Sequence, residues 1–538
     1  MQQSTFPLQM RGTAFSRETR GDLPMTFAIH PRRFAAALAA VLATGLVAVA
    51  SYADAATPRR GGTLTIGTEA EFNGFNHRKA RIFNQNTMNP ASAVMETLFA
   101  YEGSNIVPRL GLELTEAPDR LSAVVKLREG VKFHDGTPFN ADAVVHHYNW
   151  VLASDSGINR SMMATIKAVE KVDDHSVRFV LDKPWTALRS ALAIDSLLNY
   201  IGSPSALQND PEGFHRKPVG TGPFVFKEWR AGDSVTMERN PDYWDSSLPY
   251  LDQVVYRILP DGNTRYQSIK SGEVDIGRMD VAAHIVDAKK QSDLVVHEHE
   301  GSGGFMWNFN HSKPPFDDAR ARAAVVHAFN APAMSETYFL GTMAVSTDLL
   351  GASSSWHCPN LDWRGYDPGK AKALLDEIGK PLEFQLTTTN TPAGRRQGAM
   401  IQQFMEQAGI EMEIRLVEQS QNVRVGLSGD YEMDVWRFND VGGDPDLVLT
   451  SYFSNKTGRA VLRHDATKID ALLDQAREET DEKKRHQMYC DVAQAFSDDA
   501  IALIPIRTTY FMIAQPYVKD LPPLQNSLIR TRSMWLDK

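Results

Sequence analysis

The chain is 538 residues long, carries a formal net charge of −9 and contains only two cysteines. The acidic balance argues against nucleic acid as a partner, because binding it requires a basic surface that neutralises phosphates. The length exceeds what one hydrophobic core usually holds, so two or three domains are expected.

Residues 1–55 have the pattern of a signal peptide. A basic stretch ending at Arg33 runs into the uncharged segment Phe34–Val49, and we expect cleavage after Ala55. An uncleaved anchor is the alternative, but this apolar segment is shorter than the roughly 20 residues that span a bilayer. Met25 is an alternative start of translation. No cysteine lies near the cleavage point, so we expect a periplasmic protein without a lipid anchor.

The first half of the mature chain mixes strands with helices. Asn89-Pro90 is typical of a helix start, with Asn as the cap and Pro in the first position. Ser122–Phe133 predicts two paired strands that turn at Glu129-Gly130. Asn140 is expected to cap a helix over Ala141–Leu152. Further strands are expected at Gly62–Gly67, Phe224–Phe226, Ser234–Glu238 and Val254–Leu259.

The second half alternates strands with helices. Such crossovers predict parallel strands with right-handed connections, and therefore an α/β fold. Ligands of these sheets bind beyond the carboxyl ends of the strands, which are expected here at Thr387–Asn390 and Asn439-Asp440. The predicted elements are Leu382–Leu386, Arg395–Ala408, Glu411–Val417, a helix from Asn422, Met433–Phe438, Lys468–Glu478, Glu482–Ser497 and Ala502–Ile506.

The two cysteines, Cys358 and Cys490, would lie in an oxidising compartment. This allows one disulfide without requiring it. The two residues are far apart in sequence, and the helical pattern around Cys490 favours a buried free thiol.

The motifs of common enzymes do not fit this sequence. Gly426–Gly429 has the wrong spacing for a hydrolase nucleophile, and Gly365–Lys370 lacks the Ser or Thr of a phosphate-binding loop. His297 and His299 would face the same side of a strand and could bind a metal, but no third ligand can be named. His134-Asp135 is expected to stabilise a turn. We expect no enzyme activity, cofactor or metal, and a secreted hydrolase of peptides or glycans is the alternative.

Five segments, in order, resemble the family 5 extracellular solute-binding proteins, which carry dipeptides, oligopeptides, nickel complexes and related solutes to ABC importers. Together they span nearly the whole mature chain. Within them, Arg239–Trp244 is better explained by packing and turn chemistry than by ligand binding. The segments are Leu127–Phe139 with Ala141–Val145, Pro218–Phe224 with Glu238–Trp244, Phe309-Asn310 with Lys313–Asp318, Tyr366–Ala371 and Asp444–Asp446.

This resemblance implies an α/β, two-lobed fold of the periplasmic binding protein type (type II, cluster C), with an extra domain beside the first lobe. Domain I would comprise residues 56–95, 216–300 and 504–538, domain II residues 96–215, and domain III residues 301–503. A monomer would close around a peptide or other small molecule and deliver it to a permease and its ATPase. A binding protein that signals through a chemoreceptor or acts on clients as a chaperone is a further alternative.

In peptide-binding relatives, an acidic residue shortly after a Trp pairs with the α-amino group of the ligand. Trp436 matches that Trp, and the acidic position falls on Asn439 without a gap and on Asp440 with one. We expect Asp440 to be the anchor, and the alternative is that it caps a turn. Dipeptide-binding relatives also carry an Arg after the Leu382 strand, where this chain has Thr387–Asn390, and this argues against dipeptide specificity. Further residues expected in the wall of the site, each of which could equally be a packing residue, are Thr388, Glu69, Phe75, Asn84, Trp307 and Asn310.

Overall fold

The computed structural model describes residues 57–78, 85–154, 162–418, 421–438, 443–457, 461–524 and 528–538. The expected signal peptide and its cleavage point lie outside these residues, as do Asn84, Asn439 and Asp440. Within the described ranges, no helix is long and apolar enough to cross a membrane.

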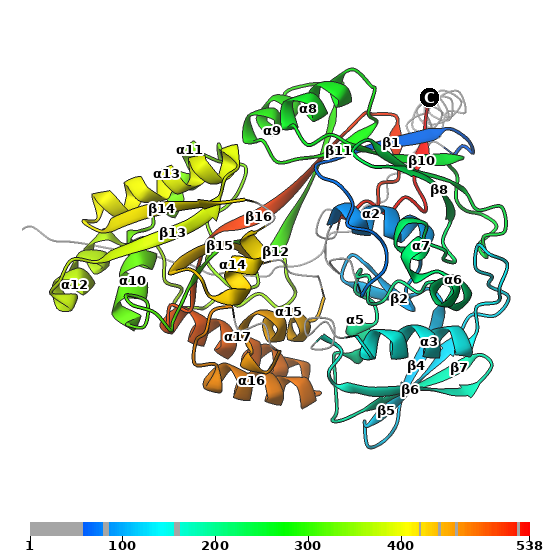
Figure 1. Cartoon of the computed structure of the whole chain (residues 1–538), viewed down its shortest axis with the longest axis horizontal. Helices are drawn as coiled ribbons and strands as arrows, with labels where there is room; N and C mark the ends of the chain where they lie inside the picture. The colour runs from blue at the N-terminus through cyan, green and yellow to red at the C-terminus, as the bar shows by residue number, and fades with distance from the viewer. Residues whose placement is uncertain are drawn as a thin grey trace, which may run out of the picture. The chain divides into compact units, whose positions relative to one another are not determined.

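A large mixed sheet organises the chain (Figure 1). Its strands are β1 (Thr63–Thr68), β8 (Phe224–Arg230), β9 (Ser234–Arg239), β10 (Gln253–Ile258), β11 (Ile276–Met279), β12 (Val295–Phe309), β13 (Glu383–Thr389), β14 (Glu411–Val417), β15 (Met433–Phe438) and β16 (Ala502–Ala514). They lie in the order β14-β13-β15-β12-β16-β11-β1-β10-β9-β8. β13 is parallel to both β14 and β15, as the alternating pattern predicted.

Three smaller sheets accompany it. β2 (Phe99–Glu102) pairs with β3 (Asn105–Pro108), and β17 (Val518–Lys519) pairs with β18 (Trp535–Leu536). The third sheet has the order β4-β5-β7-β6, with β4 at Gly111–Glu116, β5 at Ser122–Leu127, β6 at Ile166–Asp173 and β7 at Ser176–Leu181.

The helices lie both before and after β12 in the sequence. Those before β12 are α2 (Gln85–Val94), α3 (Ala141–Leu152), α5 (Leu188–Ala191), α6 (Pro204–Asn209), α7 (Pro211–Arg216), α8 (Gly262–Lys270) and α9 (Ala282–Ala288). Those after it are α10 (Ala319–Ala328), α11 (Ala331–Thr337), α12 (Pro368–Ile378), α13 (Pro392–Gln407), α14 (Asn422–Ser428), α15 (Pro445–Phe453), the short 3-10 helix η1 (Asn455–Thr457), α16 (Thr467–Glu478) and α17 (Glu482–Asp498).

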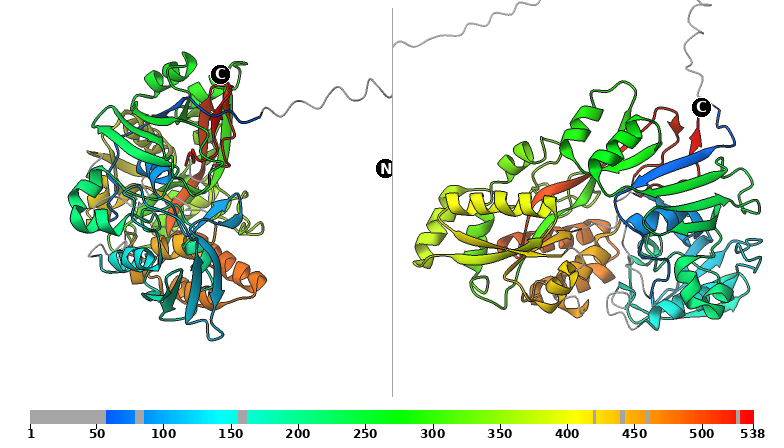
Figure 2. Two further views of the ribbon diagram at one scale, coloured as in Figure 1. Left: turned by 90° about the vertical axis from the view of Figure 1, so that its right-hand side faces the viewer. Right: turned by 45° about the horizontal axis from the view of Figure 1, so that its top comes forward.

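The hydrophobic residues form separate cores that β12 and β16 connect. One core gathers residues 64–276 with Leu447 and Met512–Leu536, and another gathers Tyr266–Leu294 with Phe511 and Ile513. We call the residues packed around these two cores, apart from Leu447, the first half. Two others draw on residues 305–506, the second half. β12 and β16 pair antiparallel along almost their full length and continue from one half into the other (Figure 2). Their register is irregular between Glu300 and Gly304.

Two local predictions are confirmed. The Asn140 side chain caps α3 by accepting a hydrogen bond from the Ala143 backbone N–H at 3.1 Å. Asp135 stabilises its own turn by accepting from the Thr137 N–H at 3.0 Å.

Two other local predictions are wrong. Asn89 does not cap a helix, because α2 begins at Gln85 and the Asn89 side-chain oxygen instead accepts from the distant Ile529 N–H at 2.8 Å. Val131–Phe133 is not a strand paired with β5, because β5 pairs with β4 and β7 on its two edges. Long-range contacts overrode the local signal in both places.

The expectation of a free thiol at Cys490 is also wrong. Cys358, in a loop after α11, forms a disulfide with Cys490 of α17. The two residues are 132 positions apart, so the bond closes a long loop in the second half.

Removing this disulfide should destabilise the protein. The double variant Cys358→Ala/Cys490→Ala is expected to lose about 2–4 kcal/mol of unfolding free energy, because the unfolded chain regains the freedom of a long loop. Urea denaturation with and without dithiothreitol measures this. The reductant should lower the midpoint of the wild type and leave the variant unchanged, and equal midpoints for the two untreated proteins would contradict the expectation.

Candidate functional site

The two halves touch where α15 and α16 approach residues 183–190. The Trp185 Nε1–H donates to the Asp446 Oδ2 at 2.7 Å, and both side chains are buried. The Lys183 Nζ lies 3.0 Å from the Asp474 carboxylate. Leu447, next to Asp446 on α15, packs into the core of the first half. Further hydrogen bonds join the halves here, among them a buried one from the Asp444 N–H to the Ser190 Oγ at 3.2 Å and one from the Thr186 N–H to the Arg477 carbonyl at 3.0 Å.

The Asp444-Pro445-Asp446 motif fixes the start of α15. Asp444 caps the helix by accepting from the Asp446 N–H at 3.0 Å, and its carboxylate also binds Arg485 and Tyr489. Asp446 accepts from the Arg477 guanidinium at 3.0 Å. Burial raises the pKa of Asp444 although Arg485 opposes this. The motif thus places Gly443, directly before it, beside the other half, where an added Cβ would clash with the Tyr101 hydroxyl oxygen.

Glu96 likewise holds loop segments in place, in the first half. Its buried carboxylate accepts hydrogen bonds from Thr221 at 2.9 Å, Tyr243 at 2.7 Å and Trp244 at 2.9 Å. Burial raises the pKa of Glu96, and these three donors oppose the rise. The two parts of one family-like segment, Pro218–Phe224 and Glu238–Trp244, therefore meet at one carboxylate, which agrees with the interpretation of Arg239–Trp244 as packing and turn chemistry.

Several expected wall residues are packed inside the protein. Phe75 contacts the Trp229 ring edge-on in the first core, with ring centres 6.0 Å apart. Trp307 is fully buried against Phe329. Asn310 donates to the backbone carbonyls of Gly429 and Tyr431 at 3.1 and 2.9 Å. These contacts give each side chain a structural task.

Thr388 lies inside a strand and not beyond its end. β13 continues to Thr389, so the predicted carboxyl end of this strand was placed too early. Thr388 is fully buried and faces Gly398 of α13, where an added Cβ would lie 3.3 Å from the Thr388 methyl group.

Trp436 is half-buried on β15, opposite Met306 of β12. Its ring lies close to α14, because a Cβ on Gly426 would approach the ring to 2.7 Å. The strand ends at Phe438, as predicted, and the expected anchor Asp440 and its neighbour Asn439 follow it outside the described residues.

Glu69 belongs to a charged group that the sequence did not single out. Its carboxylate pairs with Arg278 of β11 at 2.5 Å, and the Arg278 guanidinium lies 5.5 Å from the centre of the Tyr510 ring. Burial acts to lower the pKa of Arg278, but Glu69, Tyr510 and Asp280 together outweigh it, so the pKa is raised. Arg437 of β15 lies 4.4 Å from the Phe305 ring. In the sequence, the signals for this charged group were Arg278, in the middle of the short strand 276–279, and Arg437, directly after Trp436.

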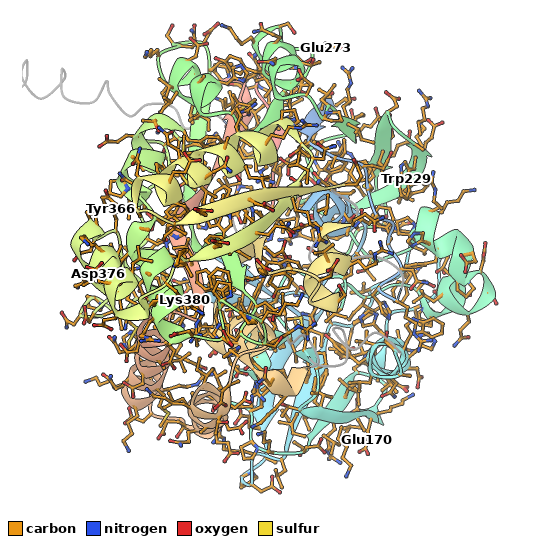
Figure 3. The ribbon with its side chains drawn as sticks, turned by 60° about the vertical axis from the view of Figure 1, so that its left-hand side comes forward. Glu170, Trp229, Glu273, Tyr366, Asp376 and Lys380 are labelled. Atoms are coloured by element: carbon orange, nitrogen blue, oxygen red, sulfur yellow. A yellow bond between two sulfur atoms is a disulfide. The ribbon has the colours of Figure 1, made fainter. Side chains whose placement is uncertain are left out.

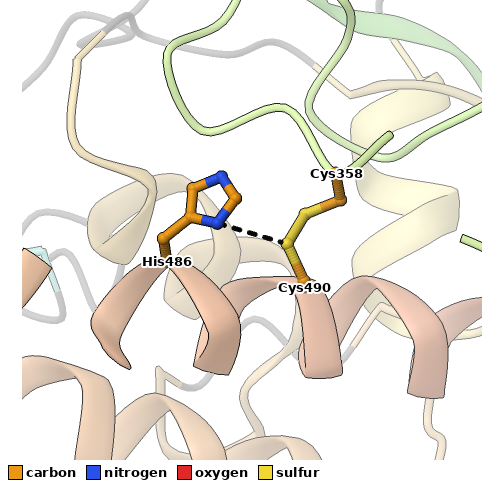
Figure 4. Close-up of side chains that lie close together, drawn as sticks. All are labelled: Cys358, His486 and Cys490. Carbon is orange, nitrogen blue, oxygen red and sulfur yellow. Dashed lines mark hydrogen bonds between the residues drawn. A yellow bond between two sulfur atoms is a disulfide. The ribbon is translucent and has the colours of Figure 1, made fainter. Parts of the chain in front are cut away.

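A sulfur and imidazole group lies in the second half (Figure 4). Among the described residues, the ligand atoms of Cys358, His486 and Cys490 lie within 4.8 Å of one another. Both sulfurs are consumed by the disulfide, and the His486 Nδ1 lies 3.7 Å from the Cys490 sulfur. His297 and His299 are not part of this group.

The sequence is similar to known binding proteins. Residues 105–459 match the model of the bacterial extracellular solute-binding proteins, family 5. The chain is 30% identical over 493 residues to di/tripeptide-binding protein 2 of Pseudomonas aeruginosa (strain UCBPP-PA14), covering 84% of this chain and 91% of that protein. It is 25% identical over 492 residues to the dipeptide-binding protein of Escherichia coli (strain K12), covering 85% and 91%.

Solved structures share the fold. The periplasmic binding protein DppA of Helicobacter pylori, in complex with the peptide STSA, superposes with a TM-score of 0.80 at 24% identity, covering 89% of this chain and 99% of that one. NikA of Brucella suis, in complex with Fe(III)-EDTA, gives 0.78 at 23% identity, covering 88% and 100%. Both the length of the match and the fold lead to one conclusion: the chain belongs to the family 5 bacterial extracellular solute-binding proteins, which are binding proteins of ABC transporters and not enzymes, and it has their two-lobed α/β fold.

Proposed function

We propose that this protein captures a peptide-like solute between its two lobes in the periplasm and delivers it, unchanged, to the permease and ATPase of an ABC importer. The observation that carries the proposal is the pairing of two separately packed halves through β12 and β16, with a second contact at Trp185 and Asp446. A hinge and a closing contact are what a clamp requires. The protein would act as a monomer after removal of residues 1–55, without a lipid anchor.

The lobes are assigned as domain I (56–95, 216–300 and 504–538), domain II (96–215) and domain III (301–503). The four-stranded sheet β4-β5-β7-β6 falls within the second range. The two cores of the second half fall almost entirely within the third, and these two placements support the boundaries.

The hinge would lie at the irregular register of β12. A Cβ on Gly304 would lie 2.6 Å from the Ile504 side chain and 2.8 Å from the Ile506 carbonyl oxygen, so β16 approaches β12 more closely there than a side chain allows. Irregular pairing at a glycine permits bending without loss of the neighbouring ladder hydrogen bonds.

In this proposal the solute amine is bound by Asp440, with Trp436 stacking beside it. Trp436 lies on β15, and Asp440 follows this strand in the sequence. The strand ends next to the contact between the halves. Asn439 and Glu69 are further candidate contacts, and Asn84, Phe75, Thr388, Trp307 and Asn310 complete the expected wall. The relatives named as di/tripeptide-binding and dipeptide-binding proteins support a peptide-like solute.

Binding should occur without chemical change. Titration calorimetry with a panel of di-, tri- and tetrapeptides is expected to find binding, and small-angle scattering should give a smaller radius of gyration with the bound peptide. Mass spectrometry should recover the peptide intact. Recovery of cleaved peptide would contradict the proposal and favour the hydrolase.

The contact between the halves should contribute to affinity. Trp185→Phe removes the indole donor to Asp446 and keeps most of the ring packing. A hydrogen bond to a charged group contributes about 1.5–3 kcal/mol, so peptide affinity should fall by roughly tenfold to a hundredfold. Calorimetry on the wild type and the variant measures the change.

Trp229→Phe is the matched control. Trp229, labelled in Figure 3, also donates to a carboxylate, that of Glu71 at 3.0 Å, but both residues belong to the first half. Loss of the hydrogen bond from Trp229 to Glu71 should leave peptide affinity within about twofold of the wild type. Equal losses in the two variants would show that the Trp185 contact does not act through closure.

The amine anchor is tested at Asp440. Asp440→Asn should weaken binding of a peptide with a free α-amino group by about tenfold or more, because a charge-assisted hydrogen bond becomes a neutral one. The N-acetylated form of the same peptide should bind both proteins equally weakly. Unchanged affinity for the free peptide would eliminate this role.

A further inference from the structure

Charged side chains of both halves gather beside the central strands β11, β16, β12 and β15. In the first half, Glu69 pairs with Arg278 at 2.5 Å, and Asp280 pairs with Arg265 at 2.7 Å. Each of these two carboxylates therefore already has an arginine partner.

Arg437 comes to this group from the second half. It lies on β15 directly opposite Phe305 of β12, and its guanidinium is 4.4 Å from the centre of that ring. Burial lowers the pKa of Arg437 and the positive charge of Arg278 lowers it further, whereas Tyr510, Glu69 and Asp280 act in the opposite direction. The two guanidinium groups, one from each half, are therefore close enough to repel each other.

The Arg437 guanidinium has no carboxylate or carbonyl partner in the described part of the chain, although it is half-buried. Other arginines inside the protein are compensated: Arg265 by Asp280, Arg477 by Asp446, and Arg485 by Asp444. Removing a cation from water without a partner is unfavourable, so such a group is retained only where something else supplies the opposite charge.

We propose that Arg437, with Arg278 facing it, binds a carboxylate of the solute when the lobes close. This deepens the proposed function, on which it rests, by naming a required feature of the cargo. Arginine suits this task because its planar fork donates two parallel hydrogen bonds to one carboxylate.

The local charges indicate a single anionic group. Among the described residues, Glu69 pairs with Arg278 and Asp280 pairs with Arg265, so the positive charge of Arg437 is left without a paired carboxylate. One carboxylate balances it. The chain also offers no basic residue between β13 and Arg395, so a carboxylate at that edge of the sheet would find no cation there.

The test compares peptides that differ only in this group. Ala-Ala, Ala-Ala-Ala and Ala-Ala-Ala-Ala, each as the free acid and as the C-terminal amide, are titrated into the wild type and Arg437→Gln, with succinate and an opine as carboxylates that lack a peptide bond. The wild type should bind at least one free acid about tenfold to a hundredfold more tightly than its amide. In Arg437→Gln the two forms should bind equally.

Two further variants separate this role from a structural one. Arg437→Lys keeps the charge but not the fork and should retain part of the preference for the acid. Arg415→Gln removes a half-buried arginine on β14, an edge strand of the large sheet, where it is paired with Asp430, and it should leave the preference unchanged. The melting temperature of ligand-free Arg437→Gln should equal or exceed that of the wild type, because an uncompensated charge is removed.

The outcomes distinguish the two proposals. Equal binding of acids and amides by the wild type, or an unchanged preference in Arg437→Gln, overturns the carboxylate site and leaves peptide binding standing. Binding of the opine or succinate that is lost in Arg437→Gln, with no binding of any peptide, supports the carboxylate site and overturns peptide binding. If nothing binds the wild type, both proposals fail.

Discussion

The antiparallel pairing of β12 with β16 is the constraint on which the rest of the structure depends. These strands run from one half into the other, and every buried backbone N–H and C=O along them must keep a partner. Sliding of one half along the other would break the whole ladder, whereas bending at the irregular register near Gly304 disturbs only a few bonds. Alternation along β12 also assigns its faces to different cores, with Trp307 on one side and Met306 on the other.

Buried carboxylates hold the loops that approach the other half. Glu96 gathers three donors from two distant segments, and Asp444 and Asp446 each bind an arginine behind α15. A buried charge that loses its partner destabilises a protein by several kcal/mol, so these groups fix loop positions more firmly than surface contacts could. The segments that carry the family resemblance are therefore largely a framework. The residues that distinguish one solute from another must lie elsewhere, and Arg437 is the one that we propose.

The fold could be predicted where local patterns and final packing agree. Glu411–Val417 and Met433–Phe438 have the predicted bounds, and in Glu411–Val417 the alternation of polar with apolar residues is that of a strand covered on one side. The prediction failed where distant partners decide. Asn89 is a strong cap in isolation, but Ile529 takes its side-chain oxygen, and Cys358 meets Cys490 only after the second half has folded around them.

The site was harder to predict than the fold, for the same reason. Trp307 and Asn310 match positions of the family pattern, yet their side chains point into the core and to backbone carbonyls. Once a β-bulge interrupts a strand, the position of a residue in the sequence no longer determines which face of the strand its side chain occupies. Arg437 went unnoticed because its importance depends on the absence of a counter-charge nearby, and only three-dimensional neighbours reveal that.

The first core contains residues from both ends of the described part of the chain, since Met512–Leu536 pack with Leu64 and Ile66. That half cannot complete its interior until the last residues have been delivered, whether by a ribosome or through a membrane pore. The second half, which is nearly continuous in sequence, meets no such delay. The path of the polypeptide therefore allows residues 305–506 to pack before the tail arrives, whereas the first half needs Met512–Leu536 to close its interior.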